Sequence, residues 1–308
     1  ADTNVALIEN NDGVETSWFM SDSSANLFVI RAGFTKKRML DRIASLKMNA
    51  VIFQVRPQCD AVYQSSIEPW SPWLSGSMGR SPGYDPLAFC IREARARGIE
   101  VHAWFNPFRA LSNNSQQVCG NHIARAMPQI TKRYGSMTWC DPGLPETRSR
   151  ALLVIMDVVR RYDIDGVHLD DYFYPYPSGG LRFSDGKSPA QRRAYVDGFV
   201  SSLYSSVKKQ KSWVRVGISP FGIWQPGIPA GIEARVNAYD HLYGDSRRWL
   251  QEKADATGLV IERPEVDEAG AFAAALLAGS AYMSRKHLAA LAADPVGGGV
   301  HESLQVAL

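Results

Sequence analysis

Apolar and polar residues alternate along four short segments of the chain, at residues 51–56, 101–107, 165–171 and 214–220. Successive side chains of a β-strand point to opposite faces, so this alternation predicts four strands that each have one apolar face. The opposite faces carry polar or large residues, namely Gln54, Arg56, His102, Trp104, Asn106, His168, Asp170, Arg215 and Ser219.

Each predicted strand follows a stretch with the periodicity of an amphipathic helix. These stretches cover residues 36–46, 86–97, 145–161 and 191–209. Helices that alternate with strands predict parallel strands joined by crossover helices. Central strands of an open, doubly wound sheet would be apolar on both faces, whereas a strand face with polar and large residues suits the interior of a barrel. The pattern therefore favours a (β/α)8 TIM-type barrel.

The third predicted strand ends in a group of polar and aromatic residues that suits a catalytic site. His168, Asp170 and Tyr172 share its polar face, and Asp171 points to the opposite face. A buried polar group without a hydrogen-bond partner costs about 1–3 kcal/mol, so such residues are better tolerated where a strand end lines a cleft for a polar substrate. The alternative is a pair of aspartates that only caps the turn after the strand.

The chain resembles the glycosyl hydrolase-like 10 family over roughly residues 36–251, about two-thirds of its length. Two motifs that carry the resemblance are His102-Ala103-Trp104-Phe105-Asn106-Pro107 and Asp141-Pro142-Gly143. Further matching motifs occupy residues 49–57, 66–71, 83–87, 165–177, 217–224 and 238–246. The resemblance implies a TIM-barrel glycosidase of the bacterial envelope that acts on a polysaccharide, in particular the glycan strands of peptidoglycan. It also implies export to the periplasm or cell envelope, although no signal peptide is visible in the sequence.

Both ends of the chain depart from the family pattern. The opening offers one weak strand candidate at residues 14–22, and residues after 251 run into an Ala-rich segment with helical character. We therefore expect a barrel domain at residues 1–251 and a divergent, mostly helical tail at residues 252–308. The barrel is expected to be incomplete or irregular at its C-terminal end, and any catalytic residue on later strands would be absent.

Glycosidic cleavage generally uses two carboxyl groups. Asp170 is the best-placed acid, at the mouth end of its strand, and Asp171 is the expected second catalytic residue, with Glu68 and Asp240 as further candidates. The residues expected to bind substrate are Gln54, Arg56, Trp104, Asn106, Arg109, His168, Tyr172, Tyr174 and Ser219. Arg56 has an alternative role in an interior ion pair, the tyrosines can pack within a loop, and the histidines can be buried interior residues.

Two other functions remain open at this point. One is a barrel that binds glycan without cleaving it, and the irregular C-terminal end strengthens that interpretation. The other is a metal-dependent hydrolase of the polysaccharide deacetylase type, which His168, Asp170 and Asp171 permit. The sequence has no HxH or HExxH signature, so we expect neither a metal nor another cofactor.

Composition further limits the classes of protein to which the chain can belong. The 308 residues are 45% hydrophobic, which suffices for one large barrel core, and the net charge of +3 does not favour a nucleic-acid partner. No run of eighteen apolar residues predicts a membrane span. The cysteines lack the spacing of a zinc site, and Cys119 and Cys140 form either a disulfide in an exported protein or free thiols. The sequence indicates no oligomeric state.

Overall fold

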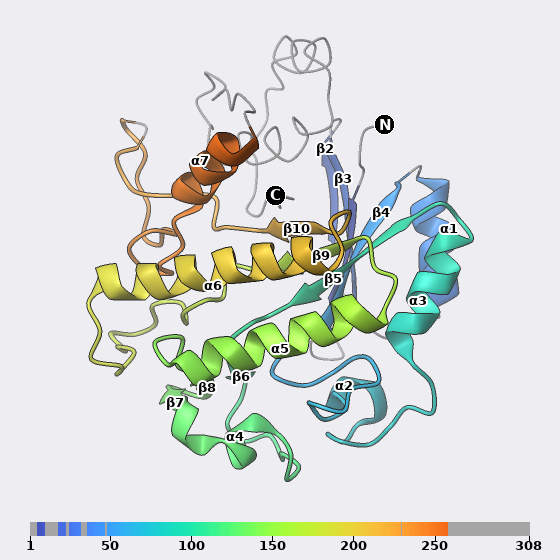
Figure 1. The fold of residues 1–308 in the computed structure, drawn as a ribbon, viewed down its shortest axis with the longest axis horizontal. Coiled ribbons are helices and arrows are strands. Elements are labelled where there is room, and N and C mark those ends of the chain that lie inside the picture. The colour runs from blue at the N-terminus through green and yellow to red at the C-terminus, as the bar shows by residue number, and fades with distance from the viewer. Residues whose placement is uncertain are drawn as a thin grey trace.

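The computed structural model describes residues 5–9, 18–22, 25–31, 36–46, 48–228 and 230–257 (Figure 1). Helix α7 (Ser246–Thr257) continues across the predicted domain boundary at residue 251. The remainder of the predicted tail, residues 258–308, lies outside the described residues, so the character of that segment stays a prediction.

The main sheet has seven strands in the order β10-β9-β5-β4-β1-β3-β2. All neighbouring strands are parallel except β2 and β3, which pair in antiparallel fashion. The strands are β1 (Val5–Glu9), β2 (Trp18–Asp22), β3 (Ala25–Arg31), β4 (Ala50–Arg56), β5 (Glu100–Phe105), β9 (Gly166–Leu169) and β10 (Arg215–Ile218). The four strands predicted from alternation are thus confirmed as adjacent and parallel.

The strands β4, β5, β9 and β10 lie next to one another in the sheet in the same order as in the chain. A helix separates each from the next, which is the arrangement of consecutive units in a (β/α) barrel. In the described part of the chain, β10 and β2 each pair with one neighbour, so the sheet is open at those edges. The weak candidate at residues 14–22 contains β2, which is an edge strand, and β1 lies earlier in the chain.

The long helices occupy the places that periodicity predicts. They are α1 (Lys36–Ser45), α3 (Pro86–Arg95), α5 (Pro145–Arg161) and α6 (Pro189–Gln210). Among the described helices, none combines the length and the apolar character needed to cross a membrane. Helices α5 and α6 lie side by side over one face of β5, β9 and β10 (Figure 1).

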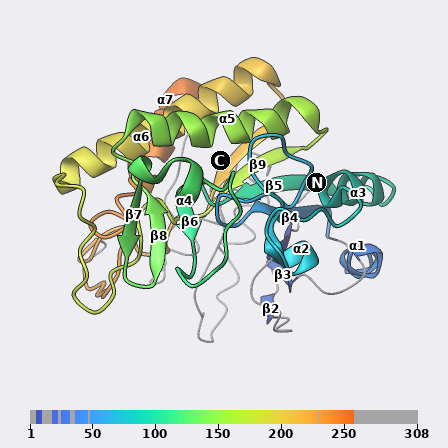
Figure 2. The ribbon, with the colours of Figure 1, turned by 90° about the horizontal axis from the view of Figure 1, so that it is seen from below.

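A second, three-stranded sheet lies in the connection between β5 and α5, and the alternation pattern does not predict it. Its antiparallel strands are β6 (Arg109–Leu111), β7 (Thr131–Tyr134) and β8 (Met137–Cys140), in the order β6-β8-β7. Figure 2 shows this sheet apart from the main sheet, next to the short helix α4 (Ile123–Ala126). The remaining short helices are α2 (Pro72–Ser75) and a 3-10 turn at Pro128–Ile130.

Local sequence explains where two of the helices begin. The Asp85 carboxylate accepts hydrogen bonds from the backbone N–H groups of Leu87 and Ala88, both at 3.0 Å, and Pro86 follows as the first helical residue of α3. At the start of α6, Ser188 and Gln191 form a reciprocal capping box. Both arrangements satisfy backbone donors that a helix start leaves without partners.

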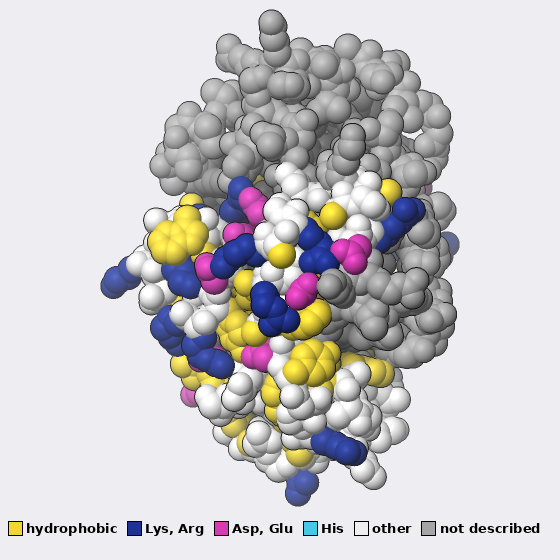
Figure 3. Space-filling model, turned by 90° about the vertical axis from the view of Figure 1, so that its right-hand side faces the viewer, with side chains coloured by type: hydrophobic (Ala, Val, Ile, Leu, Met, Phe, Trp, Pro, Cys, Tyr) yellow, Lys and Arg dark blue, Asp and Glu magenta, His cyan; other side chains and the backbone are white. Residues whose placement is uncertain are grey.

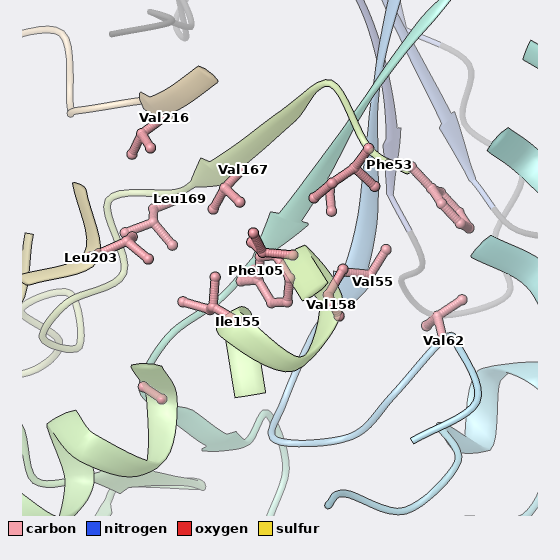
Figure 4. Close-up of a cluster of buried hydrophobic side chains, with 14 of the residues drawn as sticks. Phe53, Val55, Val62, Phe105, Ile155, Val158, Val167, Leu169, Leu203 and Val216 are labelled. Carbon is pink, nitrogen blue, oxygen red and sulfur yellow. The ribbon is translucent and has the colours of Figure 1, made fainter. Parts of the chain in front are cut away.

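The apolar face of the sheet forms the core with α5 and α6. Figure 4 shows Phe105 and Leu169 of the sheet directed toward Ile155 of α5 and Leu203 of α6. Val55, Val167 and Val216 extend the same layer along neighbouring strands. The opposite face is also buried, because Gln54, Arg56, His102, Trp104 and His168 are all shielded from solvent. The polar face therefore lines an interior rather than the outer surface.

Charged side chains of both signs mix on the face that α1 and α3 share (Figure 3). Arg97, two residues after the end of α3, pairs there with Asp41 of α1 at 2.7 Å and with Glu93 of α3 at 3.2 Å. Solvent screens pairs of this kind, so they contribute little to stability. This face is therefore a solvated surface whose positive and negative groups are interspersed.

Gly166 lies against the buried His102 ring on the polar face of the sheet. A Cβ atom at this position would lie 2.5 Å from Nδ1 of the buried His102 ring on the neighbouring strand. We expect Gly166→Ala to destabilise the protein by about 1–3 kcal/mol, because the imidazole must shift within a packed layer. Thermal unfolding measures the effect.

Gly198→Ala is the matched control, since a Cβ there meets nothing within 4 Å and lies in a helix interior. This variant should match the parent or be more stable, because alanine favours helix. Equal midpoints for Gly166→Ala and the parent would contradict the packing described for His102.

Candidate active site

The polar residues at the ends of the parallel strands meet at one edge of the sheet. Gln54, Trp104 and His168 lie in register on β4, β5 and β9. Just beyond the strand ends, the backbone N–H of Asn106 donates to the carbonyl of Arg56 at 2.9 Å. The backbone N–H of Ser219 likewise donates to the carbonyl of Leu169 at 2.9 Å. The carboxyl ends of the strands therefore gather the predicted site residues, as they do at the mouth of a barrel.

Asp170 lies at the centre of this edge, immediately after β9, and its side chain is buried. Its Oδ2 atom accepts hydrogen bonds from Nε1 of Trp104 at 3.0 Å and from Nδ2 of Asn106 at 3.1 Å. Its Oδ1 atom accepts from the backbone N–H of Tyr172 at 3.2 Å. Because Oδ1 has a single, longer contact, it is the oxygen better placed to carry a proton.

Burial raises the pKa of Asp170 from its ordinary 3.8 to about 7. The nearby Asp171 carboxylate acts in the same direction, since two negative charges disfavour each other. The Arg109 guanidinium and the hydrogen bonds from Trp104 and Tyr172 oppose the shift without cancelling it. Near neutral pH this carboxyl group is thus divided between its protonated and ionised forms, which is the condition that suits a general acid.

Arg109 connects the strand end to the aromatic residues of the following loop. Its Nε and Nη2 atoms donate to the carbonyl of Pro57 at 3.1 and 3.0 Å, and its guanidinium lies 5.1 Å from the Tyr172 ring centroid. Its backbone N–H donates to Oδ1 of Asn106 at 2.9 Å, which orients the Asn106 amide toward Asp170. The Arg109 side chain is therefore fixed close to the acid while Nη1 makes no hydrogen bond among the described residues.

Some aromatic residues of the segment after Asp170 lie at the mouth of the site, and others are buried in the core. Tyr172 is half-buried, stacks on Trp139 at 6.0 Å and meets the Tyr176 ring edge-on at 4.8 Å. The Tyr176 hydroxyl donates to Oδ2 of Asp171 at 2.5 Å. Burial raises the pKa of Asp171 to about 6, and the Tyr176 hydrogen bond opposes that shift. Tyr172 and Asp171 therefore lie beside Asp170 at the carboxyl end of β9, and their roles in substrate binding and catalysis stay predictions.

Tyr174 does not reach the mouth. Its ring is 1% exposed and packs edge-on against Tyr243 at 4.9 Å and Phe183 at 5.5 Å, with the Arg192 guanidinium 5.3 Å from its centroid. The prediction that Tyr174 stacks on a sugar is wrong in this structure, because both neighbours and burial close the ring to a ligand. The sequence suggested that Tyr174 would share one side of the loop with Tyr172 and Tyr176, because the three tyrosines occupy every second position.

Arg56 takes the alternative role of an interior ion pair. Its Nε and Nη2 atoms donate to the two carboxylate oxygens of Glu68 at 2.8 and 2.6 Å. Its remaining N–H groups donate to the carbonyls of Asn106 and Pro107 and to Sγ of Cys59. All five guanidinium donors are thereby used. The expectation that Arg56 holds Asp170 or a substrate carboxylate is therefore wrong, and Glu68 is removed as a catalytic candidate for the same reason.

His168 and Ser219 form a contact beneath the mouth. Nε2 of His168 lies 2.6 Å from Oγ of Ser219, and Nδ1 has no partner among the described residues. Burial and the neighbouring His102 lower the pKa of His168 to about 3, so the ring is neutral at physiological pH. His168 and Ser219 thus engage each other, as interior residues do, and Gln54 is buried in the same layer.

The metal-dependent alternative finds no ligand set in the part of the chain that the structure describes. No group of three His, Cys, Asp or Glu side chains there is arranged to hold a metal ion. His168, Asp170 and Asp171 follow one another in sequence, but each is bound to a different partner, namely Ser219, Trp104 with Asn106, and Tyr176. Asp240, the other candidate carboxylate, is exposed in a loop.

Trp139 is the residue of this site that sequence reasoning missed. It is fully buried, supports Tyr172 by stacking, and donates from Nε1 to the carbonyl of Phe173 at 3.1 Å. It comes from β8 of the small sheet, whose existence the alternation does not predict. Its position two residues before the Asp141-Pro142-Gly143 motif was the available signal.

The chain belongs to the glycosyl hydrolase-like 10 family, whose model matches residues 14–276. It is 42% identical over 233 residues to glycosyl hydrolase YngK of Bacillus subtilis (strain 168), covering 70% of this chain and 46% of that protein. It is 35% identical over 239 residues to glycosyl hydrolase DigH of Escherichia coli (strain K12), covering 69% and 54%. The chain thus spans about half the length of the curated relatives it matches.

Among solved structures, α-L-fucosidase isoenzyme 2 from Paenibacillus thiaminolyticus aligns with a TM-score of 0.49 and 14% identity. The alignment covers 74% of this chain and 34% of that chain. A likeness of this size does not define a fold by itself. The fold assignment rests on the strand order and on family membership.

The raised pKa of Asp170 predicts a pH-dependent stability. The folded chain holds this proton more tightly than the unfolded chain, so the folded state loses stability as pH rises from about 4 to about 7. Asp170→Asn removes the ionisation, and we expect it to be more stable than the parent at pH 8 by roughly 2–4 kcal/mol. The difference should shrink toward pH 4.

Chemical denaturation at pH 4.5 and pH 8 measures this difference. Asp240→Asn is the matched control, because Asp240 is exposed, and its stability difference from the parent should be near zero at both pH values. A stability difference for Asp170→Asn that does not change with pH would mean that the carboxyl group titrates normally.

Proposed function

We propose that this chain is a glycoside hydrolase domain and that Asp170 is its proton donor. The observation that carries the proposal is the buried carboxyl group of Asp170 at the carboxyl end of a parallel strand, where burial raises its pKa to about 7. Membership of the glycosyl hydrolase-like 10 family supports the reaction class, as do the names of its relatives. Cleavage of a glycosidic bond needs a carboxylic acid that remains protonated near neutral pH.

In the proposed reaction, Asp170 donates its proton to the oxygen of the scissile glycosidic bond. Trp104 and Asn106 both donate to Oδ2, which stabilises the carboxylate that forms as the proton departs from Oδ1. These donors are fixed before the reaction, since Asn106 is itself oriented by the backbone of Arg109. Prearranged donors of this kind lower the energy of a charge that develops during the reaction.

Asp171 is the proposed second carboxyl group. Burial raises the pKa of Asp171 to about 6, and the charge of Asp171 in turn raises the pKa of Asp170. Beside a proton donor, a second carboxylate serves as base or nucleophile. The Tyr176 hydroxyl fixes one oxygen of Asp171, and the residue is only partly buried.

Substrate contacts are assigned to the residues that remain accessible around the two acids. The Nη1 group of Arg109 faces no protein acceptor among the described residues and can donate to a sugar oxygen. The half-buried Tyr172 contributes an aromatic surface, held in place by Trp139. Gln54 is buried and Ser219 contacts His168, so neither is among these accessible residues.

The proposed substrate is a bacterial envelope polysaccharide, in particular the glycan strand of peptidoglycan, and the proposed location is the periplasm or cell envelope. Both follow from the family resemblance. The two acids, the aromatic ring of Tyr172 and the Nη1 group of Arg109 are compatible with any polymeric glycan.

The test compares the parent, Asp170→Asn and Asp240→Asn on purified glycan strands, with released reducing ends as the readout. We expect Asp170→Asn to lower turnover by roughly 10²–10⁴-fold, since it keeps the shape of the acid and removes its proton. Asp240→Asn should retain parental turnover. Parental activity should decline as pH rises above about 7, because the acid then loses its proton.

Glycan cleavage by Asp170→Asn at the parental rate would contradict the assigned role. A parent that retains glycan in a pull-down and releases no reducing ends would replace the hydrolase proposal with the glycan-binding barrel. Because Asp170→Asn is expected to be stable at the assay pH, lost activity cannot be attributed to unfolding once its melting curve is recorded.

A further inference from the structure

Two buried cysteines lie in contact beneath the candidate active site. The Sγ atoms of Cys59 and Cys140 are 3.7 Å apart, and the two residues are 0% and 2% exposed. Both are free thiols in this structure. Cys119, the partner that the sequence suggested for Cys140, instead directs its thiol to Oδ1 of Asn121 at 3.1 Å. The neighbour of Cys140 is therefore Cys59.

The backbone holds both cysteines in position. Cys59 follows β4 and has a φ of 55°, a left-handed conformation that few residues other than glycine adopt. Cys140 ends β8, and its N–H donates to the carbonyl of Phe108 at 2.7 Å. The two thiols thus approach each other from the loop after β4 and from the small sheet. Their sulfurs are 3.7 Å apart, against about 2.05 Å in a disulfide bond.

Charged and polar groups surround the two sulfurs. Nη2 of Arg56 lies 3.1 Å from the sulfur of Cys59. Contact with Cys59 and burial raise the pKa of Cys140, so Cys140 keeps its proton longer. The two sulfurs are therefore held in contact inside the folded chain.

We propose that Cys59 and Cys140 are a disulfide-forming pair that links the loop after β4 to the small sheet. With a disulfide such as oxidised glutathione as the oxidant, the thiolate of one of the two cysteines attacks one sulfur and releases one glutathione thiolate. The thiolate of the other cysteine then attacks the protein sulfur of this mixed disulfide and releases the second. Two protein thiols lose two hydrogens in total, and one glutathione disulfide becomes two glutathione thiols. Because both cysteines are buried in the folded chain, the exchange takes place during folding.

The link would stabilise the layer that supports Asp170. The Cys59 sulfur contacts the Arg56 guanidinium on one side and the carbonyl of Arg109 at 3.4 Å on the other. Arg56 in turn binds the carbonyl of Asn106, whose side chain donates to Asp170. The two cysteines are 81 positions apart in the chain, and closing a long loop restricts the unfolded chain most strongly.

The test uses the double variant Cys90→Ser/Cys119→Ser, which leaves only the proposed pair. The protein is refolded from denaturant with either reduced or oxidised glutathione, denatured again, alkylated and weighed by mass spectrometry. After oxidised refolding we expect no alkylated cysteine and a mass lower by two hydrogens. The oxidised form should melt about 5 °C higher than the reduced form, and reductant should abolish the difference.

Adding Cys59→Ser or Cys140→Ser to this background supplies the matched controls, which have one thiol and should show no such gain in melting temperature. Peptide mapping of the oxidised parent provides a second measurement that does not depend on the variants, and it should join the peptides of Cys59 and Cys140. Two alkylated thiols after oxidised refolding, glutathione bound to a single cysteine, or a Cys119–Cys140 link in the parent would each overturn the proposal.

Discussion

The burial of the Asp170 carboxyl group is the constraint on which the rest of the site depends. A carboxylate removed from water is costly unless donors surround it, and Trp104, Asn106 and the backbone of Tyr172 supply them. These donors and Arg109 only partly offset the burial, so the pKa stays near 7. Beneath them, Arg56 uses all its donors to hold Glu68 and the carbonyls of Asn106 and Pro107. The site is therefore a buried acid on a rigid polar support.

The strand and helix order could be predicted from the sequence because it follows from periodicity. Alternation placed Phe105 and Leu169 on the core face and Asn106 and Asp170 on the other, and both assignments hold. The small sheet was not predicted, since β6, β7 and β8 are short and do not alternate over enough residues. Its absence from the prediction also explains why Trp139 was missed.

The alternation of side chains along a strand predicted the face on which each residue lies, but not the residue with which it interacts. Arg56 and Asp170 share a face, yet Arg56 binds Glu68, because a loop twelve residues further along the chain brings a carboxylate to it. Tyr174 follows Asp170 at the same spacing as Tyr172 and Tyr176, but it turns into the cluster formed by Phe183, Tyr243 and Arg192. The neighbour of Cys140 is likewise set by a distant segment, since the loop after β4 brings Cys59 to the end of β8. Contacts between distant segments decide such cases, and a single sequence does not contain them in readable form.

The most direct test of the account is the titration of the Asp170 carboxyl group itself. Protein labelled with carbon-13 at the aspartate carboxyl groups can be followed by NMR from pH 4 to pH 9, with the Asp170→Asn variant identifying the signal. The account predicts a midpoint near pH 7. A midpoint close to the ordinary aspartate value of 3.8 would contradict it, because an acid ionised throughout the neutral range has no proton to donate.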